Sequence, residues 1–286
     1  MKSIVRRKLP MTWALLISLL LVVTLSTAAY TAAAPKKPAI ESEVTLATTT
    51  STQDSGLLDV MIPAFEKKFK NKVKVKVVAV GTGQAIQLGK DSNADVLLVH
   101  ARKSEDEFVA QGYGIKACDV MYNQFLLVGP KDDPAKAAAA KNAVEAFTKI
   151  AEAKAKFVSR GDDSGTHKKE KSIWDKSTIK PQGSWYISAG QGMGETLRMA
   201  EEMGAYTLVD EATFLTNKTN QVILFKGDKD LINPYGMIQV KSTRKKVAAN
   251  ELIWFFISPQ GQKMIGDFGK NKFGKSIFVP DFKWRK

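Results

Sequence analysis

Short apolar runs rich in β-branched residues alternate with amphipathic stretches along the chain, beginning at residue 44. Residues 44–50 (VTLATTT), 73–80 (VKVKVVAV) and 94–100 (ADVLLVH) have the composition and length of strands. Between them, residues 56–69 carry apolar side chains at the spacing of one helical face, and residues 81–89 (GTGQAIQLG) open a second helix. Strands that alternate with helices predict a parallel sheet.

The same unit recurs in the second half of the chain. Residues 123–130 (NQFLLVGP) and 156–159 (KFVS) are predicted strands, and residues 165–177 (GTHKKEKSIWDKS) a predicted helix. Near the end, Leu252–Ile257 is apolar on all sides. This run is far shorter than the roughly 20 residues of a membrane-spanning helix, so we expect it in a core.

Two α/β lobes of ordinary size follow from this repetition. We expect residues 41–122 with 234–286 in one lobe and residues 123–233 in the other, joined by crossovers near Tyr122 and Asn233–Pro234. Ligands of such sheets bind beyond the carboxyl ends of strands, and two lobes offer a cleft between them. The functional site is therefore expected in that cleft.

The first 34 residues have the pattern of a targeting segment. A basic start (Lys2, Arg6, Arg7 and Lys8) precedes the apolar run Met11–Val23, and small residues at 31–34 form a cleavage site. A retained anchor is the alternative, but the apolar run is short for a membrane span. We expect a cleaved signal peptide at residues 1–34, ordinary secretion and a periplasmic protein.

The single cysteine and the net charge limit which anchors, disulfides and binding partners we expect. Cys118 lies far from the signal, so we expect neither a lipid anchor nor an internal disulfide. Removal of residues 1–34 lowers the net charge from +14 to +10. Such a basic chain suits nucleic acid, an anionic membrane or a small anion. The lysines are scattered, the basic tail Lys283–Lys286 is short, and no nucleic-acid motif with interleaved aromatics occurs.

Three strand-to-helix junctions, at residues 48–52, 81–83 and 164–166, share one chemistry. Each places hydroxyls or closely approachable N–H groups where a helix begins. A helix N-terminus has unpaired N–H donors and carries about half a positive charge, so it attracts oxyanions. Arg160 adds a planar fork of donors beside the third junction. Ordinary N-capping is the alternative for any one junction. The candidate anion-binding residues are Thr49, Thr50, Ser51, Gly81, Thr82, Gly83, Arg160, Ser164, Gly165 and Thr166.

Other interpretations of the third junction are weaker. Ser164 as a hydrolase nucleophile needs a base, and His167 follows it on the same helical turn in poor geometry. The Gly-x-Ser-x-Gly elbow is missing. Arg160-Gly161-Asp162 matches an adhesion motif over three residues only. We expect no enzyme.

Metal and cofactor motifs are also missing from the sequence. Two dispersed histidines and one cysteine do not form a transition-metal site, and there is no phosphate-binding Gly-Lys-Ser loop. We therefore expect no cofactor and no protein-bound metal. The glycine-rich stretch Ser188–Leu197 is either a fourth anion-facing turn or a flexible connection.

The sequence resembles the tungstate-binding proteins of bacterial ABC importers, the TupA type. The motifs that carry the resemblance are TTTST, DSGLLD, SRGDDSGTHKKE, GMGETL and NPYGMI, and it spans nearly all of residues 44–280. It implies a two-lobed α/β periplasmic-binding-protein fold of type II and capture of a tetrahedral oxyanion in the cleft by the candidate residues above. It also implies delivery to a membrane permease, and we expect a monomer. Tungstate is the expected anion, and molybdate is the alternative that the resemblance leaves open.

Two aspartates decide between oxyanions. Tungstate, molybdate and sulfate offer only acceptors, whereas monohydrogen phosphate also carries a proton that needs an acceptor. Asp162 or Asp163 could supply that acceptor, which keeps phosphate open. If instead they orient Arg160 or cap the helix, phosphate is disfavoured. Sulfate, which is smaller, is separated by pocket volume.

Overall fold

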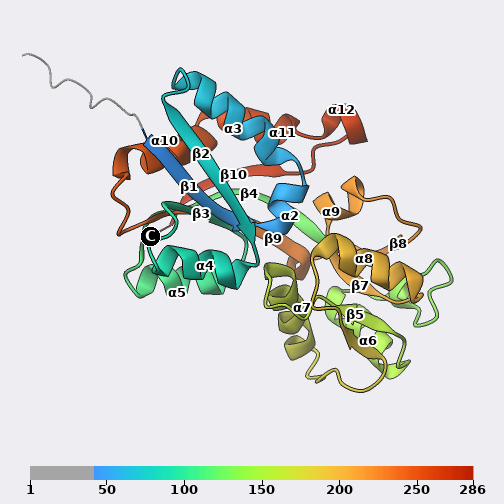
Figure 1. Ribbon diagram of the computed structural model, residues 1–286. Coiled ribbons are helices and arrows are strands. Elements are labelled where there is room, and N and C mark those ends of the chain that lie inside the picture. Colours follow the sequence, from blue (N-terminus) through green and yellow to red (C-terminus); the bar gives the residue numbers. More distant parts are fainter. Residues whose placement is uncertain (1–41, 286) are drawn as a thin grey trace, which may run out of the picture. The chain divides into compact units, whose positions relative to one another are not determined.

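The computed structural model describes residues 42–285. The expected signal peptide at residues 1–34 lies outside this range, so it stays a prediction. Within the described range, the larger sheet has the strand order β10-β4-β9-β3-β1-β2 (Figure 1). Its strands are β1 (Ser42–Thr49), β2 (Val73–Val80), β3 (Val96–Val99), β4 (Gly114–Gly129), β9 (Ile232–Val240) and β10 (Val279–Trp284).

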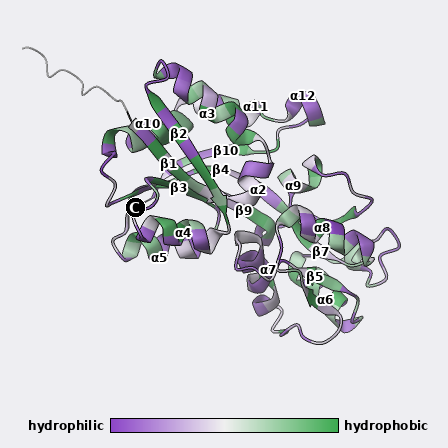
Figure 2. Ribbon diagram, viewed as in Figure 1, coloured by the Kyte–Doolittle hydropathy of each residue, from purple (hydrophilic) through white to green (hydrophobic). Residues whose placement is uncertain are grey.

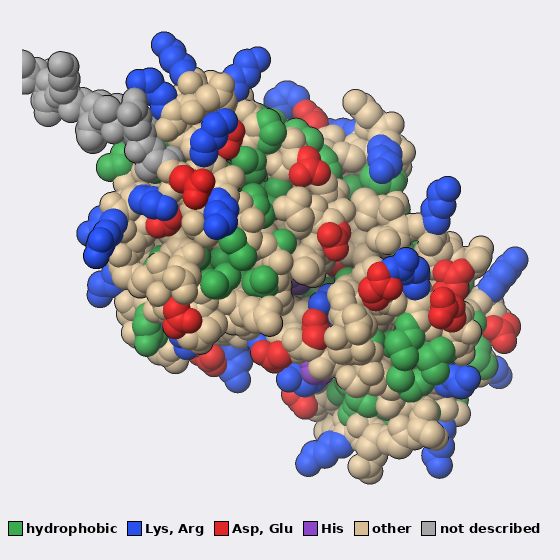
Figure 3. All heavy atoms as spheres, in the orientation of Figure 1, with side chains coloured by type: hydrophobic (Ala, Val, Ile, Leu, Met, Phe, Trp, Pro, Cys, Tyr) green, Lys and Arg blue, Asp and Glu red, His purple; other side chains and the backbone are tan. Residues whose placement is uncertain are grey.

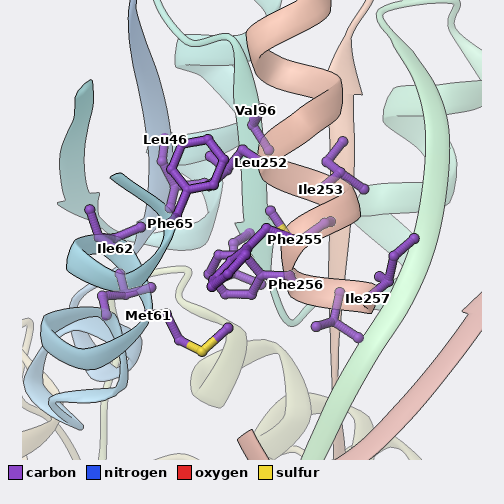
Figure 4. Close-up of a cluster of buried hydrophobic side chains, with 14 of the residues drawn as sticks. Leu46, Met61, Ile62, Phe65, Val96, Leu252, Ile253, Phe255, Phe256 and Ile257 are labelled. Carbon is purple, nitrogen blue, oxygen red and sulfur yellow. The ribbon is translucent and has the colours of Figure 1, made fainter. Parts of the chain in front are cut away.

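Helices cover both faces of this sheet. Alternate residues of β3 point to opposite faces: Val96 and Leu98 belong to one apolar cluster, Leu97 and Val99 to another. The first face is covered by α3 (Leu57–Lys68), α10 (Lys246–Ile257) and α11 (Pro259–Asp267), and the second by α4 (Thr82–Lys90) and α5 (Arg102–Ala110). Figure 4 shows Phe65 of α3 beside Leu252 and Phe255 of α10.

The C-terminal half of β4 continues into a second arrangement of the same kind. There β4 pairs with β7 (Thr207–Asp210) and β8 (Val222–Phe225), and β5 (Phe157–Ser159) pairs in parallel with β6 (Tyr186–Ser188). Phe125 and Leu127 of β4 pack on the side of α6 (Ala143–Glu152) and α7 (Gly165–Lys176). Leu126 and Val128 pack on the side of α8 (Met193–Glu202). Figure 2 shows these strands as apolar and the outer helix faces as polar.

Short helices complete the chain. They are α2 (Thr50–Asp54), α9 (Glu211–Thr216), α12 (Lys270–Phe273) and the single 3-10 turns at Ala137–Ala139 and Lys229–Leu231. Within residues 42–285, no helix is both long enough and apolar enough to cross a membrane. The run Leu252–Ile257 is part of α10 and, apart from Trp254, lies in the core, as the sequence predicted.

The structure corrects several predicted elements. The larger sheet is mixed rather than parallel: β1 is parallel to β2 and β3, but β9 runs antiparallel to β3 and β4. The fourth strand begins at Gly114, not at Asn123, and β7 was not predicted. Helix α6 covers only part of the Ala- and Lys-rich stretch of residues 134–156, and α10 ends at Ser258, which caps α11. Pro259 at the first position of α11 has no N–H to continue α10.

Strands β4 and β9 pass together from the larger sheet toward the second arrangement. Tyr122 is paired with Pro234, and Asn123 with Asn233. These are the residues at which the sequence predicted the crossovers between lobes. The described residues, 42–285, belong to one compact unit. The lobe boundaries therefore stay a prediction.

Candidate anion-binding site

Each of the three polar junctions lies at the start of a helix. Thr49 caps α2, with its hydroxyl accepting from Thr52 N at 3.3 Å. Gly81 precedes α4 in an extended conformation. Ser164 caps α7, with its hydroxyl accepting from His167 N at 3.2 Å. Thr49 and Ser164 therefore act as ordinary helix N-caps. A capped helix still directs its other N–H groups outward, so capping and anion binding are compatible.

The structure brings these junctions together although they come from distant parts of the chain. A Cβ atom added to Gly83 would lie 3.0 Å from Asp163 Oδ2, so the glycine turn faces the loop before α7. A Cβ atom added to Gly165 would lie 2.6 Å from the ring of His100. Nε2 of the same ring is 3.5 Å from the hydroxyl of Ser51 in α2. The starts of α2, α4 and α7 thus surround one small region.

Buried donors without partners mark this region. Thr82 Oγ1, Arg160 Nε and Thr166 Oγ1 are buried and have no hydrogen-bond partner within the described part of the chain. The three side chains are 0%, 4% and 1% exposed. Most buried polar groups in folded proteins are hydrogen-bonded, so each exception needs an explanation. Asn123, Gln221, Gln239 and Arg285 each carry one such atom elsewhere in the described residues. The three exceptions among the candidate residues differ from these in lying together where three helices begin.

Arg160 is held in place by an acid of its own loop. Its Nη2 donates to Asp162 Oδ2, and Asp162 Oδ1 accepts from Ser164 N at 3.2 Å. Burial raises the pKa of Asp162, but hydrogen bonds from Ser164 and the charge of Arg160 outweigh it, so the pKa lies below its usual value. Asp162 is therefore an anion with both oxygens engaged. It orients one side of the guanidinium and leaves Nε for another acceptor.

Asp163 points to lysine rather than to Arg160. Its Oδ2 accepts from Lys168 Nζ at 2.6 Å, and its side chain is exposed. The backbone of Asp163 has a φ of 57°, a conformation that Asp tolerates better than most residues. Asp163 thus shapes the turn before α7.

A buried carboxyl group supports the strand end that carries Arg160. Glu170 of α7 accepts from Ser159 Oγ at 2.7 Å, from Tyr186 Oη at 2.6 Å and from Trp174 Nε1 at 3.1 Å. The same Ser159 hydroxyl accepts from Gly161 N at 3.2 Å. Both neighbours of Arg160 are therefore tied to α7 through Glu170.

His100 is the acceptor of the site. Its Nδ1 lies 2.9 Å from Asn233 Oδ1, which can only accept, so Nδ1 carries the proton and Nε2 faces Ser51 as an acceptor. Burial, together with the charges of Arg160 and Lys169, lowers the pKa of His100 to about 4, although the hydrogen bond that His100 donates to Asn233 opposes this. Its ring stacks on Tyr235 at 4.8 Å. Sequence reasoning gave His100 no role in the site.

The hydrolase interpretation of Ser164 has no support in this geometry. The side chain of His167 accepts from Asp163 N at 3.0 Å through Nδ1, and the hydroxyl of Ser164 accepts from His167 N. No described hydrogen bond joins the imidazole of His167 to that hydroxyl. Within residues 42–285, no three or more His, Cys, Asp or Glu side chains are grouped so that they could hold a metal ion.

The glycine-rich turn before α8 differs from the other three. No described atom lies within 4 Å of a Cβ atom added to Gly190 or Gly192. Gly192 begins α8 without a side-chain cap. The turn nevertheless lies beside the Arg160 loop, because Gly190 N donates to Arg160 O at 2.9 Å.

A cavity of about 590 Å³ adjoins the site through His100 and Gly165. Its cationic lining residues are Arg102, Lys103, Lys168, Lys169 and Lys171, and its acidic ones are Glu107, Asp163 and Asp175. Burial lowers the pKa of Lys169, although Asp230 opposes this. Charged side chains of both signs crowd the hollow on the face in Figure 3. The excess of cations gives the cavity a field that favours anions.

Comparison with known proteins places the chain in a family. Residues 30–260 match the model of the PBP superfamily domain. "Tungstate-binding protein TupA" of Peptoclostridium acidaminophilum is 47% identical over 86% of this chain and 88% of its own length. The chain belongs to the TupA family of the PBP superfamily. The resemblance and the α/β binding-protein fold that the sequence predicted are thereby confirmed.

Solved structures agree with this membership in the TupA family. The tungstate ABC transporter structure from Geobacter sulfurreducens is 52% identical, with a TM-score of 0.72, and covers 79% of this chain and 98% of that one. The tungstate-binding protein TupA from Desulfovibrio alaskensis G20 is 39% identical, with a TM-score of 0.70, over 84% of this chain and 99% of that one.

Proposed function

We propose that this protein binds a tetrahedral oxyanion, tungstate or molybdate, and hands it to the permease of an ABC importer. The observation that carries the proposal is the set of three buried, unpartnered donors contributed by Thr82, Arg160 and Thr166. They come from two loops far apart in the sequence and all require acceptors. The names of its TupA relatives support the same ligand class. Binding without chemistry is the function, and the protein is not an enzyme.

The proposed ligand-binding residues are those predicted from the sequence. Hydroxyls and N–H groups at the starts of α2, α4 and α7 donate to the anion, with Arg160 as the charged donor. The candidates are Thr49, Thr50, Ser51, Gly81, Thr82, Gly83, Arg160, Ser164, Gly165 and Thr166. Their burial strengthens each interaction, because a donor aimed at a charge is worth more away from water.

Phosphate is the second candidate, and the environment of the aspartates disfavours it. Both oxygens of Asp162 accept hydrogen bonds inside the protein, and Asp163 is paired with Lys168. The remaining nearby acceptor, His100 Nε2, faces Ser51 at 3.5 Å. A site of donors without a free carboxylate suits a fully deprotonated anion. Sulfate shares that property and is separated from tungstate by size alone.

Location and assembly follow from the proposed role. An importer's binding protein acts outside the cytoplasmic membrane, which agrees with the signal peptide predicted at residues 1–34. We propose that the mature chain is a monomer whose two lobes, residues 41–122 with 234–286 and residues 123–233, close over the anion. Tyr122 and Asn233–Pro234 would carry the hinge, because β4 and β9 pair there.

Native mass spectrometry tests the function directly. The purified mature protein is stripped of anions and then mixed with equal amounts of tungstate, molybdate, sulfate and phosphate. We expect a single bound anion per chain, tungstate or molybdate. A protein that retains only phosphate, or none of the four, would overturn the proposal.

A further inference from the structure

A patch of exposed aromatic side chains lies on the outer side of α10 and β10. Trp254 is 48% exposed, Trp284 43% and Phe282 37%, and Val247 one heptad before Trp254 is 43% exposed. The rings of Trp254 and Trp284 are 5.6 Å apart, and those of Phe282 and Trp284 5.5 Å. These four residues, Val247, Trp254, Phe282 and Trp284, are called the aromatic patch. Large apolar side chains gathered on a surface commonly mark an interaction site.

The core does not require this patch. Helix α10 buries its opposite side, including Leu252 and Phe256, against the sheet. Strand β10 is the edge of that sheet, and it pairs with β4 between Cys118 and Tyr122. The polar turns of the proposed anion site lie at the starts of α2, α4 and α7 instead. The patch thus needs an explanation apart from folding and anion binding.

Lysines lie close to the aromatic residues. Lys246 lies two turns before Trp254 on α10. Lys283, between Phe282 and Trp284 in strand β10, points to the face of that strand opposite the two rings. Lys116 reaches Asn250, one turn before Trp254, at 2.6 Å. Acidic residues in these segments are Glu251 and Asp281, the latter 2.8 Å from Lys283. Figure 3 shows Lys and Arg side chains along the side where Figure 1 places α10 and the C-terminal end.

We propose that the aromatic patch and its lysines adsorb to the surface of a membrane that contains anionic lipid. Tryptophan prefers the headgroup region of a bilayer, where its apolar ring and its N–H group are both accommodated. Lysines beside such rings are attracted to anionic headgroups. Together they give reversible adsorption, which concentrates the protein near a membrane-bound partner without a lipid anchor.

The charge and the strand geometry argue against a second copy of this chain as the occupant. A two-fold contact through the patch would gather Lys116 and Lys246 of both copies at one interface, where their like charges repel. Pairing of two β10 edges is hindered by Pro280, which lacks an N–H, and by the irregular register between Pro280 and Lys283.

Flotation with lipid vesicles tests the proposal. The mature protein is mixed with vesicles of phosphatidylcholine alone or with an equal part of phosphatidylglycerol. We expect flotation with the anionic vesicles only, and its loss in about 1 M salt, where the Debye length falls to about 3 Å. Failure to float with anionic vesicles at low salt would overturn the proposal.

Two variants connect the adsorption to the patch. Trp254→Ser combined with Trp284→Ser should weaken partitioning by at least about tenfold, because it removes two aromatic side chains from the interface. Tyr113→Ser is the matched control, since Tyr113 is an exposed aromatic residue that stacks on Phe108, on the opposite face of the sheet. Unchanged partitioning of the double variant, or equal loss in the control, would contradict the proposal.

A charge variant and the oligomeric state complete the test. Lys116→Gln combined with Lys246→Gln leaves the rings in place and should weaken partitioning about fivefold for each lysine. This variant tests the proposal if the tryptophan variant does not fold.

Two other outcomes would assign the patch a different partner. A parent protein that is a dimer, and a tryptophan variant that is a monomer, would identify the patch as a self-interface. If the tryptophan variant partitions onto vesicles as the parent does but anion import in cells is impaired, the patch contacts the permease. Either result would overturn membrane adsorption.

Discussion

Two nitrogen atoms of the Arg160 guanidinium have different environments and therefore different consequences. One Nη donates to Asp162, which stiffens the loop, while Nε is buried without a described partner. A hydrogen bond to a charged group contributes roughly 1.5 to 3 kcal/mol. Arg160→Ala should therefore weaken oxyanion binding by about ten- to a hundredfold or more. Arg160→Lys should restore part of it, because lysine keeps the charge but not the planar fork.

Calorimetric titration of both Arg160 variants with tungstate and molybdate measures this effect. Asp162→Asn is the useful companion, since it removes the charge that orients Arg160 and retains its size. We expect it to weaken binding less than Arg160→Ala does. An Arg160→Ala protein with the affinity of the parent would show that Arg160 only stiffens its loop.

The buried threonine hydroxyls allow a test in which affinity and stability change in opposite directions. Thr166→Val removes a buried hydroxyl that has no described partner, so the anion-free protein should gain roughly 1 kcal/mol of stability. The anion loses a donor, so its affinity should fall by about tenfold.

The control for Thr166→Val is Thr207→Val. The Thr207 hydroxyl donates to Val158 O at 2.7 Å, so its removal should lower stability and leave affinity unchanged. Thermal unfolding without anion, together with calorimetry, gives both quantities for both variants. A Thr166→Val protein that loses stability and keeps its affinity would place that hydroxyl outside the anion site.

His100 makes the stability of the protein depend on pH. Burial lowers its pKa to about 4, whereas an unfolded histidine titrates near 6.5. Between these values the unfolded state binds more protons, so the His100 contribution is complete above pH ~6.5 and falls by roughly 3 kcal/mol as the pH drops to ~4. Because the chain has two histidines, NMR titration against a His167→Gln variant identifies the His100 resonance. A midpoint near 6.5 would contradict its burial in the folded site.

At the scale of elements, α7 must approach the end of β3 closely. A Cβ atom at Gly165 would lie 2.6 Å from the His100 ring, and forcing extra atoms into a packed contact costs about 1 to 3 kcal/mol. Gly165→Ala should therefore weaken anion binding roughly ten- to a hundredfold. If closure creates this contact, stability without anion should hardly change, because the open protein avoids the clash.

Gly192→Ala is the control for Gly165→Ala, because Gly192 also lies at the start of a helix, as the N-cap of α8, and has open space around its Cβ position. Calorimetry and thermal unfolding of both variants measure the effect. Equal affinity in the Gly165→Ala protein and the parent would show that α7 need not approach His100 for binding.

The elements that sequence could predict are those set by local periodicity. Strands β1, β2 and β3 and helix α3 follow from apolar spacing over a few residues. The first half of β4 was missed because Lys116, with a φ of 53°, and the shifts of register opposite β9 interrupt its alternation. The mixed direction of the sheet depends on pairing between β3 and β9, which lie far apart in the sequence.

The candidate site shows the same limit of sequence reasoning. Hydroxyls, glycines and Arg160 at helix starts were visible because a helix cap is a local pattern. The roles of His100 and Glu170 were not, because they arise from partners such as Asn233 and Tyr186 that only the fold brings near. A buried acid supported by neutral donors has no signature in the sequence of its own helix.

For the whole molecule, the central claim is that an oxyanion completes the buried donors where α2, α4 and α7 begin. Anomalous diffraction at the tungsten absorption edge, from crystals grown with tungstate, locates the metal atom directly. The account predicts one strong peak per chain, with tungstate oxygens about 2.7 to 3.2 Å from Arg160 Nε, Thr82 Oγ1 and Thr166 Oγ1. A tungsten atom elsewhere, such as in the lysine-lined cavity beside Lys169, with those three donors still unpartnered, would contradict it.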